Sequence, residues 1–81
     1  MNDRTPYHIA QSAIADLKSS IYLILYNQQG EGLLNVEIGK ALGIYQGHIR
    51  HEGHIPRTLL AIMEEEGVVE QNKETKKWKL K

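Results

Sequence analysis

Basic side chains gather in the last ten residues of this 81-residue chain. Residues 72–81 contain five lysines and one glutamate, a net charge of +4, whereas five basic and nine acidic residues give residues 1–71 a net charge of −4. The formal net charge of zero therefore conceals a basic segment. A binding partner responds to the charge of the local surface that it contacts and not to the net charge of the chain. Lysines suit phosphate groups as point charges that read no sequence, although lysines also guard edge strands against aggregation. The candidates for phosphate contact are Lys73, Lys76, Lys77 and Lys79.

A second set of candidate binding residues lies on a helix that Pro56 is expected to open and that runs to about Glu66. Arginine can form a bidentate pair with guanine, threonine can bond to a base or a phosphate, and alanine can contact a thymine methyl group. The helical period predicts an apolar face made of Leu59, Leu60, Ile62 and Met63, and an opposite face made of Arg57, Thr58, Ala61, Glu64 and Glu65. The alternative is a solvated face whose glutamates are balanced by Lys40 or by the C-terminal lysines.

Three histidines recur at every third position before this helix, at 48, 51 and 54. A metal ion needs its histidine ligands to converge at about 2.0–2.1 Å, and Gly47 and Gly53 interrupt any continuous helix that would bring them together. We therefore expect no metal site, and we expect surface histidines or phosphate contacts instead. Arg50 and His54 are the candidates for nucleic-acid contact in this loop.

Catalytic groups are sparse. The chain has no cysteine and only two aspartates, and its three serines all fall in the first predicted helix. Three consecutive glutamates, at 64–66, diverge around a helix and do not pair over a substrate. The glycines lack the spacing of a phosphate-binding loop. We expect neither an enzyme nor a bound cofactor.

The first element that positions these residues is a long helix. Thr5 and Pro6 are typical of a helix start, and apolar residues then recur at spacings of three and four as far as Leu25. Residues 21–26 are apolar all round, which predicts that other elements surround this part of the helix. Residues 5–15 extend past the compact body, so we expect them to mediate self-association as a homodimer, with Ile9 and Ala13 in the contact.

Shorter elements follow. A short extended piece, residues 33–34, precedes a helix predicted over 36–42, with Asn35 as its N-cap and Gly43 as its end. A strand, a turn and a second strand are predicted over 68–71, 72–75 and 76–80. Alternation in the last strand puts Trp78 and Leu80 on one face and three lysines, at 77, 79 and 81, on the other.

Length and composition limit this chain to one small domain over residues 1–81. A mass of 9.2 kDa corresponds to burial of about 63% of the surface of the unfolded chain, enough for one modest core. Hydrophobic residues are 41% and charged residues 25%, close to the average for a globular chain. No apolar run is long enough to span a bilayer, the N-terminus lacks a signal-peptide pattern, and the absence of cysteine is compatible with the cytoplasm.

The order of these elements resembles that of the winged helix-turn-helix family. The resemblance covers about residues 16–81 and rests on three segments: residues 36–44, with their Leu-Gly turn, residues 59–70, and Trp78-Lys79-Leu80. It implies a mainly helical α+β fold of three helices and a C-terminal two-stranded wing. It also implies that the third helix enters the major groove and that the wing contacts phosphates. About a dozen residues separate Gly43 from Pro56, where the family usually has a handful.

The sequence thus predicts a small DNA-binding protein, a regulator of transcription, with double-stranded DNA as its partner and no membrane contact. The alternative is a protein-interaction module on the same scaffold, with no nucleic acid. The two differ in whether the basic residues form one continuous face without Glu64 and Glu65 in its middle. The predicted DNA contacts are Arg50, His54, Arg57, Thr58, Ala61, Lys73, Lys76, Lys77 and Lys79.

Overall fold

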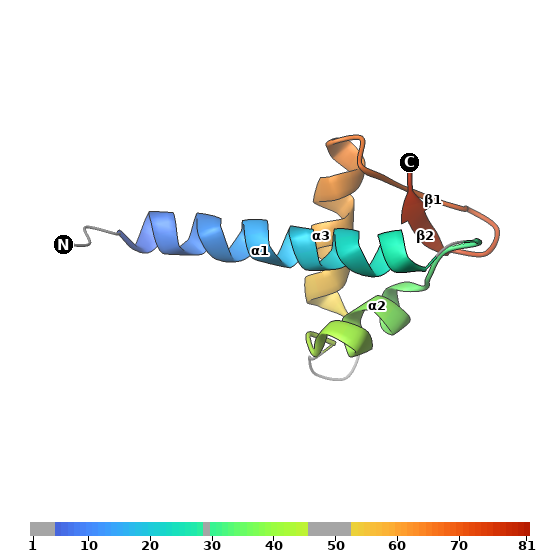
Figure 1. Ribbon diagram of the computed structural model, residues 1–81, viewed down its shortest axis with the longest axis horizontal. Coiled ribbons are helices and arrows are strands. Elements are labelled where there is room, and N and C mark those ends of the chain that lie inside the picture. Colours follow the sequence, from blue (N-terminus) through green and yellow to red (C-terminus); the bar gives the residue numbers. More distant parts are fainter. Residues whose placement is uncertain (1–4, 29, 46–52) are drawn as a thin grey trace.

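Three helices precede a two-stranded antiparallel hairpin in the computed structural model, which describes residues 5–28, 30–45 and 53–81 (Figure 1). The sequence predicted this mostly helical α+β layout with an extended first helix, and the structure confirms it. The elements are α1 (Pro6–Asn27), α2 (Asn35–Leu42), α3 (His54–Glu65), β1 (Val69–Gln71) and β2 (Trp78–Leu80).

Helix α1 begins where the sequence predicts, at Pro6, and ends at Asn27. The Thr5 hydroxyl accepts a hydrogen bond from the His8 backbone N–H at 3.2 Å, and Pro6 occupies the first turn. Only the second half of the helix crosses α3 and the hairpin, and the first half projects away from them (Figure 1). The prediction that residues 21–26 are surrounded is wrong: Leu23 and Tyr26 are each 58% exposed. The other elements of this small domain cover one side of α1 and leave the other open.

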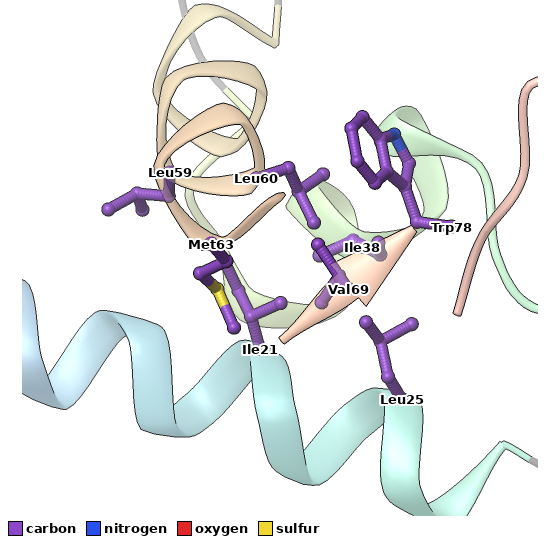
Figure 2. Packing of buried hydrophobic residues seen from close by; sticks show 8 residues of the cluster. All are labelled: Ile21, Leu25, Ile38, Leu59, Leu60, Met63, Val69 and Trp78. Atoms are coloured by element: carbon purple, nitrogen blue, oxygen red, sulfur yellow. The ribbon is translucent and has the colours of Figure 1, made fainter. Parts of the chain in front are cut away.

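The core gathers side chains from every element: eight buried hydrophobic residues form one cluster, and most of them point into the space between α1, α2, α3 and the hairpin (Figure 2). Ile62 was predicted to belong to this core but is 38% exposed. The buried side of α3 is made of Pro56, Leu59, Leu60 and Met63, and Ile62 lies at the edge of that side. The buried set is Ile21, Leu25, Ile38, Leu59, Leu60, Met63, Val69 and Trp78.

The hairpin is tied to the segment before α2. Leu33 exchanges two backbone hydrogen bonds with Trp78, of 2.7 and 2.9 Å, and so adds a short bridge beside β2. Within the hairpin, Gln71 pairs with Trp78 and Val69 with Leu80. The Asn72 side-chain oxygen accepts hydrogen bonds from two backbone N–H groups of the turn, at 2.8 and 3.0 Å. These bonds fix the turn that carries the candidate lysines.

Helix α2 begins one residue before its predicted start. Leu34 is the N-cap, and its backbone N–H donates to the Glu37 carboxylate at 2.7 Å. Asn35, the predicted cap, instead donates from its side-chain amide to the Gly53 carbonyl at 3.2 Å. This bond joins the start of α2 to the start of α3. Gly43 ends α2 with a φ of 73°, as predicted.

Candidate nucleic-acid interface

Helix α3 presents an exposed face beside a firmly buried one. It begins at His54, two residues before its predicted start, after Gly53 with a φ of 75°. Its opposite side is anchored by the buried residues Pro56, Leu59, Leu60 and Met63. Four predicted contact residues, His54, Arg57, Thr58 and Ala61, are all exposed. No acidic residue occurs in α3 before Glu64, so its first two and a half turns or so carry no negative side chain.

The start of α3 is held close to α2 by Tyr45, a residue that the sequence analysis passed over. A Cβ atom added to Gly39 would lie 2.9 Å from the Cβ of Tyr45, and one added to Gly53 would lie 2.5 Å from its ring. Lys40 of α2 also contacts the tyrosine: its ammonium lies over the Tyr45 ring, 5.7 Å from the ring centre. The signal for this contact in the sequence was the pair Gly39 and Gly53, because such close packing against a tyrosine requires residues without a Cβ.

The lysines of the hairpin are less free than their sequence suggests. Three of the four predicted contacts lie near carboxylates: the ammonium of Lys77 is 3.3 Å from Glu31, that of Lys73 is 3.9 Å from Glu64, and that of Lys79 is 4.0 Å from Glu70. All three acids lie outside the basic segment of residues 72–81. The acidic part of the chain therefore folds back against the basic part. Among the described residues, no ion pair involves Lys76, the fourth of these lysines.

Glu64 separates the two halves of the candidate interface. It lies seven positions after Arg57 on α3, which is about two turns or 10 Å along the same side of a helix. Its carboxylate also meets Lys73 of the hairpin turn. The surface thus runs from Arg57 at the start of α3, past Glu64, to the hairpin. The described basic residues do not form one continuous face, which by the criterion given above favours the protein-interaction alternative.

The predictions for Arg50 and for the three histidines at 48, 51 and 54 fall wholly or partly outside the described residues. Arg50 lies in the segment 46–52, as do two of the three histidines, so the structure does not describe them. His54, the third histidine, occupies the first turn of α3. In the part of the chain that the structure describes, no group of three or more histidine, aspartate or glutamate side chains could hold a metal ion. Nor does that part contain a helix long and apolar enough to cross a bilayer.

Comparison with protein-family models, with curated proteins and with solved structures finds no match to this chain.

Proposed function

We propose that this chain binds double-stranded DNA through the first half of α3, as a regulator of transcription that belongs with the winged helix-turn-helix proteins it resembles. The observation that carries this proposal is the exposed, acid-free start of a helix whose other side is buried in the core. A recognition helix needs both properties, because its N-terminal side chains enter the major groove while the body of the domain holds its angle. The proposal includes the cytoplasmic location expected from the sequence.

Three side chains on this half of α3 suit base contacts. Arg57 is exposed and offers a planar set of donors that matches the two acceptors of guanine. Thr58 can donate to a base or a phosphate, and the small side chain of Ala61 allows the helix to approach closely or to contact a thymine methyl group. Glu64 and Glu65 lie nearer the C-terminal end of α3, where a helix that enters the groove by its first turns lifts away from the DNA.

The hairpin lysines would contact neighbouring phosphates. Their ion pairs are exposed and 3.3–4.0 Å long, and such pairs typically contribute about 0–1 kcal/mol. A phosphate can therefore replace the carboxylate at modest cost. Lys76, exposed in the turn, is the lysine best suited to this role.

The same ion pairs favour a second candidate function, a protein-interaction module without nucleic acid. Glu31, Glu64 and Glu70 lie beside three hairpin lysines, so the surface alternates in charge. A surface of mixed charge fits a protein partner of complementary pattern better than it fits a uniformly negative duplex.

A binding titration with Arg57 variants tests the proposal. We expect the wild-type protein to bind duplex DNA at about 50 mM salt and to bind more weakly as salt rises. On a preferred site selected from random duplexes, Arg57→Ala should cost about 1–3 kcal/mol, with little effect on random DNA. Arg57→Lys is the matched control: it keeps the charge but loses the bidentate geometry, so most of the preference should be lost and general affinity retained.

Fluorescence anisotropy with labelled duplexes gives these affinities. No binding to mixed duplex DNA at low salt would leave the protein-interaction module as the better function. Equal affinity for every sequence, unchanged by Arg57→Ala, would mean that the hairpin binds and α3 does not read bases.

A further inference from the structure

The first half of α1 is left exposed by the other described elements of its own chain. Residues 5–13 are all exposed, with Tyr7 at 68% and Ile9 at 52%, and this part of the helix projects from the body (Figure 1). Residues 5–15 nevertheless contain no aspartate, glutamate, lysine or arginine. A helix that stays in water normally carries charged residues on its open face, whereas depletion of charge together with exposed aromatic residues is the composition of an interface core.

An apolar groove lies where α1 crosses α3. It has a volume of about 370 Å³, and its walls are Ile14 and Leu17 of α1 and Ile55, Leu59 and Ile62 of α3, with His54 and Thr58 at its border. Ile55 is 44% exposed and Ile62 is 38% exposed. Among the described residues, no aspartate, glutamate, lysine or arginine lines this groove, so an uncharged apolar segment is the occupant that fits it.

We propose that the first half of α1 from a second copy of this chain occupies the groove between α1 and α3. The chain cannot fill its own groove with this segment, because Ile14 forms one wall and the residues before it continue in the same helix, away from α3. A second copy supplies an uncharged helix of the required kind, and residues 5–14 span about 15 Å.

The arrangement is self-complementary. Each copy offers one projecting helix and one groove, so a two-fold axis pairs both and leaves neither open. The contact is thus made twice, which doubles the apolar surface that one helix and one groove would bury. Two predicted DNA contacts, His54 and Thr58, also line the groove, whereas Arg57 and Ala61 do not. The dimer contact and the proposed DNA contact therefore adjoin on α3, and the tests below measure the dimer without DNA.

Site-directed cross-linking tests where the second copy sits. The chain has no cysteine of its own, so single variants report single positions. We expect Tyr7→Cys and Ile62→Cys proteins, one of them lengthened by a tag, to form a mixed disulfide on mild oxidation. Leu23→Cys is the matched control, since Leu23 is also exposed and apolar on α1 but lines a different hollow. It should cross-link at least tenfold less with either variant.

Sedimentation without DNA at 500 mM salt gives the oligomeric state independently of any phosphate contact. The wild-type protein should dimerise, Tyr7→Glu and Ile62→Glu should weaken the dimer at least tenfold, and Leu23→Glu should leave it unchanged. Circular dichroism checks that each variant remains helical, and because the three replaced side chains are exposed, we expect all of them to fold. A wild-type monomer at 500 µM would overturn the proposal, as would a dimer that Leu23→Glu weakens and Ile62→Glu does not.

Discussion

Tyr45 and the glycines around it determine how the candidate binding helix is held. The tyrosine ring lies against Gly53 at the start of α3 and its Cβ lies against Gly39 of α2. Asn35 adds a hydrogen bond of 3.2 Å to the Gly53 carbonyl. Together these contacts set the position of α3 despite the long connection that precedes it. The angle at which Arg57 could enter a groove therefore depends on residues that would not touch DNA.

Gly53 and Gly43 provide a matched test of this contact. Both have a positive φ, of 75° and 73°, but a Cβ atom would collide with Tyr45 at Gly53 and would meet nothing within 4 Å at Gly43. Gly43→Ala should lower the free energy of unfolding by about 1–2 kcal/mol, the cost of the left-handed conformation. Gly53→Ala should lower it by about 2–4 kcal/mol, because crowding adds to that cost. Urea denaturation followed by the fluorescence of Trp78, the single tryptophan, measures both. Equal losses would mean that the Tyr45 contact does not constrain α3.

At the scale of elements, local signals predicted the helices and the hairpin well. Thr5 and Pro6 start α1, Gly43 ends α2, and the alternation of Trp78 and Lys79 gives the last strand its buried and exposed faces, as the structure confirms. Each of these signals acts within a few residues of the chain.

Contacts between distant elements could not be predicted in this way. Lys77 meets Glu31 across 46 positions of sequence, so the charge of residues 72–81 alone overstates how basic the hairpin is. The exposure of Leu23 and Ile62 likewise depends on where α3 crosses α1, and hydrophobic periodicity does not carry that information. For the candidate site, the sequence predicted the exposed face of α3 and, as an alternative, glutamates balanced by the C-terminal lysines, which the pair of Glu64 and Lys73 matches. It did not predict the Tyr45 contact.

The hairpin can be tested lysine by lysine. Lys76 adopts a positive φ of 69°, so Lys76→Gly removes the charge without straining the turn. We expect it to weaken binding to any duplex about equally and to reduce the slope of log affinity against log salt by about one unit. Lys77→Ala is the comparison, with a somewhat smaller effect expected because its ammonium must first release the Glu31 carboxylate, 3.3 Å away. Identical slopes for wild-type and Lys76→Gly proteins would remove Lys76 from the interface.

The described part of the molecule has two exposed surfaces that adjoin on α3, where His54 and Thr58 belong to both. The start of α3 is exposed, polar and free of acids, and it lies near a hairpin of partly compensated lysines. The first half of α1 carries no charged residue, and the described lining of the groove between α1 and α3 is mostly apolar. The first surface suits a duplex and the second suits another copy of the chain, so one protein could present two recognition helices to DNA.

The measurement that tests the central claim most directly is an NMR titration of the ¹⁵N-labelled protein with a mixed-sequence duplex at about 50 mM salt. The amide resonances of residues 54–61 in α3 and of residues 73–77 in the hairpin turn should shift together, while those of residues 15–23, on α1, should not move. This pattern would assign DNA to the first half of α3 and to the turn lysines. Shifts confined to α1, or no shifts at all, would contradict the account.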